Sequence, residues 1–163
     1  MPEAISNTSP LLYLHRIGFL DCLPRLFSRL WIPTAVAREL QEGAQRGYDV
    51  PNPDDHKWMS VADPVHLPSE WLALDLGAGE LAAMALALEN PDRILFLDDA
   101  LARRTAKAAG LQVQGTLKVL LNAKQEGLIE KVEPFLARLG EAGLWVSDDV
   151  RRRVLALAGE HET

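Results

Sequence analysis

The sequence contains a single cysteine and no long apolar run. One cysteine, Cys22, excludes an internal disulfide framework, and its leucine neighbours predict a small buried core residue. No apolar run approaches the roughly 20 residues that a membrane-spanning helix needs, so we expect no membrane partner. The N-terminus also lacks a basic segment followed by an apolar one, so no secretory signal is predicted. The expected location is therefore the reducing cytoplasm.

Motifs of several common enzyme classes are missing as well. The sequence has no P-loop, no GxGxxG motif and no serine-nucleophile motif, and Gly77-Ala78-Gly79 lacks both a third glycine and a preceding strand. The four histidines show no short ligand spacing to each other or to Cys22. A zinc site is therefore not expected.

Basic charge is scarce. The chain has 17 Lys and Arg residues against 23 Asp and Glu residues, a formal net charge of −6 at pH 7. This balance argues against broad nonspecific affinity for nucleic acid. It leaves room for a local basic rim, because Arg103, Arg104 and Lys107 follow an acidic pair. Each of these three also fits an ordinary solvated helix face.

The chain of 163 residues, 48% hydrophobic and 25% charged, predicts one globular domain covering residues 1–163. Strand-like and helix-like segments alternate along it. We expect strands at 4–6, 30–32, 58–61 (an edge strand), 93–97 and 111–113. We expect helices at 11–15, with Ser9 as N-cap, and at 19–27, 33–45, 80–89, 100–109, 116–126, 132–139 and 148–158. This order predicts an α/β protein, a three-layer α/β/α fold with a mostly parallel central sheet.

Acidic or amide side chains lie where apolar stretches meet helix starts. Asn7 follows the first strand, Asp98 and Asp99 close the fourth, and Glu80 opens an alanine-rich helix. Glu39 lies about two turns into its helix, too deep for a cap. Sites in open α/β sheets form outside the carboxyl ends of the strands, so these side chains can meet at one edge. Clustered carboxylates of this kind hold Mg²⁺ or Mn²⁺, and such metals cut phosphodiesters.

Each of these residues also has a structural interpretation. Asn7 fits a turn before a helix, and Glu80 matches the positive end of a helix dipole. Glu39 fits an exposed helix face, and the Asp98-Asp99 pair fits helix capping. A different enzyme class, a receiver-like or phosphatase-like domain, would use one aspartate of the pair as phosphoacceptor. That alternative leaves Glu39 and Glu80 unexplained.

Four stretches resemble, in order, the motifs of PIN domains. They are Ile5–Leu11, Ile32–Leu40, Gly79-Glu80 with the helix after it, and Leu95–Arg103 followed by Val113–Leu120. The segment Gly143–Ser147 is similar to one subgroup of prokaryotic PIN proteins, so the resemblance spans residues 4 to about 159. It implies an α/β/α fold and Mg²⁺- or Mn²⁺-dependent ribonuclease activity. It also implies a VapC-type toxin that forms a homodimer and binds a protein antitoxin.

The resemblance assigns roles to individual residues. The acidic positions of the family fall on Glu39, Glu80 and Asp99, with Asp98 beside them, and these four would hold the metal. The hydroxyl positions fall on Thr8 and Ser9, which would bind or orient the substrate. We also expect substrate contacts from Arg103 and Thr116.

Asn7 departs from the family, which usually has aspartate at this position. An amide oxygen can coordinate a metal but brings no charge. The second hypothesis is therefore a degenerate PIN-like module that binds RNA or a protein without cleaving.

The two short helices of the N-terminal half carry more apolar residues than a small core readily buries. We therefore expect a homodimer that uses Leu12, Ile17, Phe19 and Leu23. The alternative is that these residues pack internally.

Replacing Asn7 with aspartate restores the usual family residue and tests whether position 7 faces the metal. The nearly isosteric change adds a negative charge to an acidic pocket. Without metal it should destabilise the fold by on the order of 1 kcal/mol, if one neighbouring pKa rises by about one unit. With Mn²⁺ the added charge should tighten ion binding, recover the lost stability and raise RNA cleavage. Unchanged Mn²⁺ affinity in a calorimetric titration, together with unchanged cleavage, would show that Asn7 does not face the metal.

Overall fold

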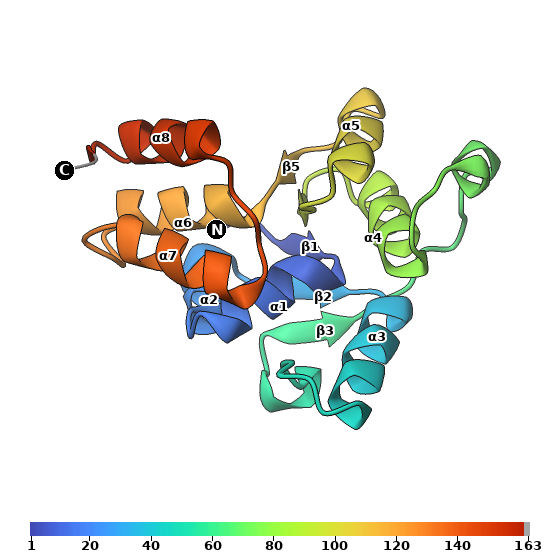
Figure 1. Cartoon of the computed structure of the whole chain (residues 1–163). Coiled ribbons are helices and arrows are strands. Elements are labelled where there is room, and N and C mark those ends of the chain that lie inside the picture. The colour runs from blue at the N-terminus through green and yellow to red at the C-terminus, as the bar shows by residue number, and fades with distance from the viewer. Residues whose placement is uncertain (162–163) are drawn as a thin grey trace.

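The computed structural model describes residues 1–161 and has a five-stranded sheet at its centre. The strands are β1 (Ala4–Ser6), β2 (Leu30–Ile32), β3 (Met59–Val61), β4 (Ile94–Phe96) and β5 (Val113–Gln114). Their order is β3-β2-β1-β4-β5, and every neighbouring pair is parallel (Figure 1). The predicted parallel sheet is confirmed, and β3 lies at an edge as predicted.

Eight α-helices connect or follow the strands within the described residues. They are α1 (Thr8–Arg16), α2 (Leu23–Leu26), α3 (Thr34–Gln45), α4 (Ala78–Glu89), α5 (Ala100–Ala108), α6 (Thr116–Gln125), α7 (Glu133–Ala142) and α8 (Asp148–Leu157). Short 3₁₀ helices cover Leu20–Cys22, Pro53–Asp55 and Ser69–Ala73. Within residues 1–161, no helix combines the length and the apolarity needed to cross a bilayer.

Side chains of the central strands alternate between two apolar cores, as the pleat of a strand requires. On one face, Ala4 and Phe96 pack with residues of α1, α2, α3, α6, α7 and α8. On the other face, Ile5, Leu95 and Leu97 pack against the alanine-rich α4 and against α5. Figure 1 shows α6 and α7 on one side of the strands and α4 on the opposite side. The predicted three-layer α/β/α arrangement is therefore confirmed.

The start of the first helix differs from the prediction. The helix begins at Thr8, with Asn7 rather than Ser9 at the N-cap position. Pro10 therefore lies in the third helical position instead of the first. A proline is tolerated throughout the first turn, because the backbone N–H groups there have no partner within the helix.

Two other helices also differ from their predicted ranges. The segment 19–27 forms a 3₁₀ turn and the four-residue α2 instead of one helix. Pro24 explains this, because proline lies only in the first turn of a regular helix. Helix α7 continues through Gly140 to Ala142 and ends at Gly143, which has φ +105°. Gly143 takes the left-handed conformation that closes the helix, and the Leu144 N–H donates to the Leu139 carbonyl at 3.0 Å.

Two of the four apolar residues proposed for a dimer surface lie inside the protein. Ile17 and Leu23 are buried in the core, and Leu12 and Phe19 pack against it while partly exposed. Phe19 also contacts Phe135 of α7 at 4.8 Å between ring centroids. The prediction that Ile17 and Leu23 form a free surface is wrong, because α6 and α7 complete the layer that covers them.

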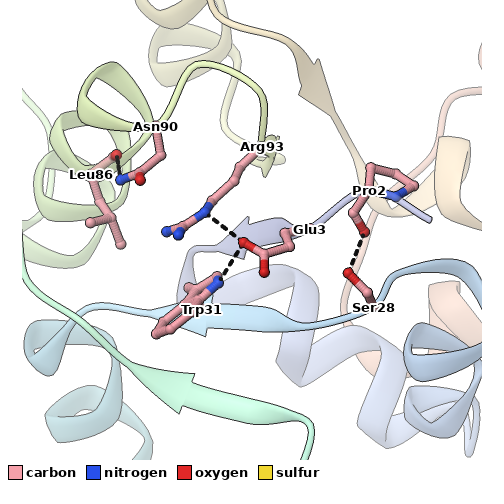
Figure 2. Close-up of polar contacts among 7 residues, drawn as sticks. All are labelled: Pro2, Glu3, Ser28, Trp31, Leu86, Asn90 and Arg93. Atoms are coloured by element: carbon pink, nitrogen blue, oxygen red, sulfur yellow. Dashed lines mark hydrogen bonds and ion pairs between the residues drawn. The ribbon is translucent and has the colours of Figure 1, made fainter.

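One carboxylate joins three segments at the amino ends of the central strands. Glu3 precedes β1 and accepts hydrogen bonds from Trp31 Nε1 at 3.1 Å and from Arg93 Nε at 2.9 Å (Figure 2). The Arg93 guanidinium lies over the Trp31 ring, 4.7 Å from its centroid. These contacts connect the start of β1 to β2 and to the residue before β4. They hold together the amino ends of the central strands, whereas the acidic residues follow the carboxyl ends.

The central pair β1 and β4 forms the switch point of the topology. The chain leaves β1 toward β2 and β3, then crosses to β4 and β5 on the other side. Helix α1 follows β1 onto one core, whereas α5 follows β4 onto the other. The segments after β1 and β4 therefore diverge, and crevices of this kind bind ligands in open α/β sheets. Ser6 pairs with Phe96, and the Asn7 N–H donates to the Phe96 carbonyl at 3.2 Å.

Candidate active site

Asn7 and Thr8 form the side of the crevice that follows β1. Asn7 is 5% exposed, and its side chain does not cap α1. Thr8 is the first residue of α1, and its hydroxyl donates a hydrogen bond to Glu39 Oε2. Ser9 occupies the next helical position and is partly exposed. The segment after β1 therefore contacts Glu39, one of the predicted metal ligands, directly through Thr8.

Glu39 connects the starts of two helices that are distant in sequence. Its Oε2 accepts from Thr8 in α1, and its Oε1 accepts from the Gly79 N–H in α4 at 3.2 Å. The interpretation of Glu39 as an ordinary surface glutamate is wrong, because its carboxylate holds α1, α3 and α4 together. Val36 and Leu40 bury the apolar face of α3, as the sequence predicted.

Gly79 permits this contact. A Cβ atom at position 79 would lie 2.8 Å from Glu39 Oε1 and 2.9 Å from Oε2, closer than side chains approach. The sequence predicted a role for Glu80 but none for Gly79. The signal was the second glycine of Gly77-Ala78-Gly79 in a first helical turn, where glycine costs stability unless a close approach requires it.

Glu80 serves as a helix cap and also belongs to the acidic cluster. Its Oε1 accepts from the Gly77 N–H at 3.1 Å, the bond expected of a glutamate in the first turn. Partial burial raises the pKa of Glu80, and the hydrogen bond from the Gly77 N–H partly offsets this rise. The negative charges of Asp99, Glu39 and Asp75 raise the pKa further. The side chain therefore lies in a crowded negative field.

Asp99 caps the helix on the β4 side of the crevice. Its Oδ2 accepts from the Ala102 N–H at 2.9 Å, in the ordinary N-cap arrangement of α5. The side chain is exposed, and its charge is one of those that raise the pKa of Glu80. The structural interpretation and the cluster interpretation thus both apply to Asp99.

Asp98 faces away from this cluster, toward α6. Its Oδ1 and Oδ2 accept from the backbone N–H and the hydroxyl of Thr116, at 2.8 and 2.7 Å. Asp63 contacts Thr34 at the start of α3 in the same way, at 2.8 and 2.6 Å. In both pairs an aspartate after one strand anchors the helix that follows the neighbouring strand. Asp98 therefore acts first as a structural anchor, since Thr116 engages both oxygens predicted to bind metal.

Thr116 and Arg103 complete the surroundings of Asp98. Thr116 is fully buried, so the predicted substrate contact is wrong for its side chain, which supports Asp98 instead. Burial raises the pKa of Asp98, against the Thr116 hydrogen bonds and the Arg103 charge, which lower it. The Arg103 guanidinium lies against Gly115, where a Cβ would be only 2.6 Å from Nη1.

The donor chemistry of the crevice fits a hard divalent cation. Glu39, Glu80 and Asp99 supply carboxylate oxygens, and Asn7 supplies an amide oxygen. Within residues 1–161, no three His, Cys, Asp or Glu side chains are arranged so that they could hold one ion together. Mg²⁺ commonly takes only one or two carboxylates and keeps several waters, so a pair from this set is sufficient.

The chain is similar to known proteins both in sequence and in fold. The family model DUF3368, a PIN domain, matches residues 3–160. Among solved structures, the fold is similar to a PilT N-terminus domain protein, SSO1118, from the hyperthermophilic archaeon Sulfolobus solfataricus P2. The TM-score is 0.55 and the sequence identity 18%, over 74% of this chain and 92% of that one. At this identity the likeness concerns the fold alone. No curated protein sequence matches this chain.

The Gly79→Ala variant tests whether the position of the Glu39 carboxylate affects metal binding when the stability of the protein is unchanged. The new Cβ should displace the carboxylate, because it would lie within 2.9 Å of both oxygens. Alanine is favoured over glycine in a helix by about 0.5–1 kcal/mol, which offsets the lost Gly79–Glu39 contact. We expect near-normal thermal stability but weaker Mn²⁺ binding by calorimetry. Gly140→Ala is the matched control, because a Cβ there meets nothing within 4 Å. Equal Mn²⁺ affinity in both variants would contradict a role for Glu39 in metal binding.

Glu80→Gln should stabilise the metal-free protein at neutral pH. The folded-state pKa of Glu80 is raised above its ordinary value of 4.5, so its ionised form costs stability once the pH exceeds that value. Glutamine removes the charge and keeps an oxygen for the Gly77 N–H. The gain should be present at pH 7 and vanish as the pH falls below 4.5. Urea unfolding in EDTA at several pH values checks this, with Glu42→Gln on the exposed face of α3 as control. A gain independent of pH would contradict the proposed charge crowding.

Proposed function

This chain belongs to the PIN-domain family, and from that premise we propose that it is a metal-dependent nuclease that hydrolyses RNA phosphodiesters. PIN domains are generally nucleases. The observation that carries the proposal for this chain is the gathering of acids at the β1–β4 switch point, where Glu39 and Glu80 both accept from N–H groups at the start of α4. Partial burial raises the pKa of Glu80, and the charges of Asp99 and Glu39 add to this shift. Like charges gathered in a crevice are unfavourable on their own, and a divalent cation removes the repulsion.

The residues of the chain divide the work of such a reaction. A pair of carboxylates from Glu80, Asp99 and Glu39, completed by waters, would hold Mg²⁺ or Mn²⁺, which when bound lowers the pKa of a water and neutralises phosphate charge. Thr8 and Gly79 orient Glu39 through their hydrogen bonds. Asn7, at the mouth of the same crevice, would orient the attacking water or the scissile phosphate through its amide. Because carboxylates must be ionised to bind metal, metal affinity should rise with pH through the pKa of Glu80.

We further propose that the protein acts as the toxin of a toxin–antitoxin pair, with a protein antitoxin as partner and a homodimer as its working form. The resemblance to VapC-type proteins supports this. A small neighbouring reading frame that encodes a DNA-binding protein would support the pairing, and light scattering tests the dimer. A single 18.0 kDa species at micromolar concentration would contradict it.

A non-catalytic PIN-like module is the second candidate function. Two observations favour it: Asn7 brings no charge to the crevice, and Glu80 and Asp99 already serve as helix caps. Capping alone would explain why these acids are present. A calorimetric Mn²⁺ titration separates the two functions, because a binding module needs no tight metal site.

Asp99→Asn tests the nuclease proposal. Asparagine caps helices as well as aspartate does, so the bond to the Ala102 N–H should persist and α5 should stay intact. Loss of one charge from the cluster should leave metal-free stability unchanged or slightly raised. The stabilisation by Mn²⁺, which scales as RT ln(1 + [L]/Kd), should shrink, and cleavage of single-stranded RNA should be abolished. Wild-type cleavage by this variant would exclude Asp99 as a ligand and leave Glu39 and Glu80 as the candidates.

A further inference from the structure

A small pocket lies beside the carboxylate cluster, on the Asp98 side of the Asp98-Asp99 pair. Its volume is about 200 Å³. Asp98, Arg103 and Gly115 line one wall, and residues 144–147 with Val150 line the other. The second wall belongs to the segment between α7 and α8 and to the first turn of α8, and Figure 1 shows this segment beside α6. Asp98 lines this pocket, and the charge of the next residue, Asp99, acts on Glu80, so the pocket adjoins the carboxylate cluster.

Arg103 brings a positive charge to the pocket of an otherwise acidic protein. Within residues 1–161, its guanidinium makes no ion pair within 4.0 Å, although its charge acts on Asp98. Both oxygens of Asp98 are engaged by Thr116. The absence of a side chain at Gly115 lets the guanidinium lie close to the backbone, because a Cβ there would be 2.6 Å from Nη1. The donors of Arg103 are therefore available to an anionic ligand.

Trp145 presents a large aromatic ring at the rim of the same pocket. Its side chain is 84% exposed, although tryptophan is highly buried on average. The segment that carries it is anchored at both ends. The Leu144 N–H donates to Leu139 in α7, and the Ser147 hydroxyl accepts from the Val150 N–H in α8 at 3.2 Å. These bonds fix the backbone on both sides of Trp145, and its exposed side chain lines the same pocket as Arg103.

We propose that this pocket binds one nucleotide of single-stranded RNA, next to the phosphodiester held at the carboxylate cluster. Trp145 stacks on the base, and Arg103 contacts the adjoining phosphate. An exposed ring beside an unpaired arginine matches the chemistry of single-strand binding, in which bases stack on aromatic side chains and cations follow the backbone. The volume lies below the roughly 300–1,000 Å³ of pockets for drug-sized ligands, so it admits one planar group. The identity of the ligand as RNA rests on the proposed function.

Binding without catalysis tests this inference. The probe is a fluorescein-labelled, single-stranded 2′-O-methyl oligoribonucleotide of mixed sequence, titrated in EDTA and followed by anisotropy. Trp145→Ala should weaken binding roughly 5- to 150-fold, the range expected for loss of one stacked base, and Trp145→Phe should retain most of the affinity. Leu157→Ala, at another exposed apolar residue of the C-terminal region, is the control and should bind as wild type.

Arg103→Gln should lower the affinity for the oligonucleotide. It should also reduce the slope of log K against log salt concentration by about one. Arg104→Gln is the matched control, because it removes the same charge from the next residue of α5 without lining the pocket. Thermal melting of each variant checks that the fold is intact, which is expected since Trp145 is exposed. A duplex of the same sequence should bind more weakly, because its bases are already stacked.

Separate readouts distinguish this inference from the proposed nuclease activity. Wild-type affinity in both Trp145→Ala and Arg103→Gln would overturn the inference and assign the pocket to another ligand, such as a protein side chain, even if Mn²⁺-dependent cleavage persists. Undetectable binding of the single strand by the wild-type protein would overturn it as well. Binding that depends on Trp145 and Arg103 without cleavage would support the nucleotide pocket and overturn the nuclease proposal.

Discussion

The parallel pairing of β1 with β4 is the constraint on which the fold and the candidate site both depend. It places Ser6 opposite Phe96, so that Asn7 and the Asp98-Asp99 pair leave the sheet at one edge. It also sends α1 and α5 to opposite faces, which opens the crevice between them. Glu3 holds the other end of the same strands through Trp31 and Arg93 (Figure 2). Without this pairing, the acids would lie on unconnected loops.

Helix N-termini explain how the fold tolerates several carboxylates in a small volume. Glu39 accepts from an N–H in the first turn of α4, Asp99 from α5 and Asp98 from α6. Each of these groups would otherwise lack a partner within its helix, and the positive end of the helix dipole favours a negative charge there. The same acids can therefore stabilise the metal-free fold and keep a site for a cation. Glu80, whose pKa is raised by burial and by its neighbours, shows that this compensation is incomplete.

Periodicity predicted the elements well and their ends less well. Short apolar runs bounded by polar residues placed all five strands within about two residues of their positions, and the alternation with helices gave the parallel sheet. The misplaced ends share one cause, because proline and glycine act through backbone geometry that the pattern alone leaves open. Pro10 was compatible with any position in the first turn. Gly140 and Gly143 were both suitable helix ends, and only Gly143 takes the left-handed conformation that closes a helix.

Residue types and their order along the chain determined the fold class, the parallel sheet and the list of acids that meet at its edge. They did not determine which oxygens of those acids remain available, because that depends on neighbours that are distant in sequence. Asp98 and Asp99 are adjacent, yet one anchors Thr116 while the other faces Glu80. Gly79 matters only because Glu39 approaches it, and Trp145 only because its segment passes Arg103. These contacts join residues at least 18 positions apart, and only the packed tertiary structure brings such residues within reach of one another.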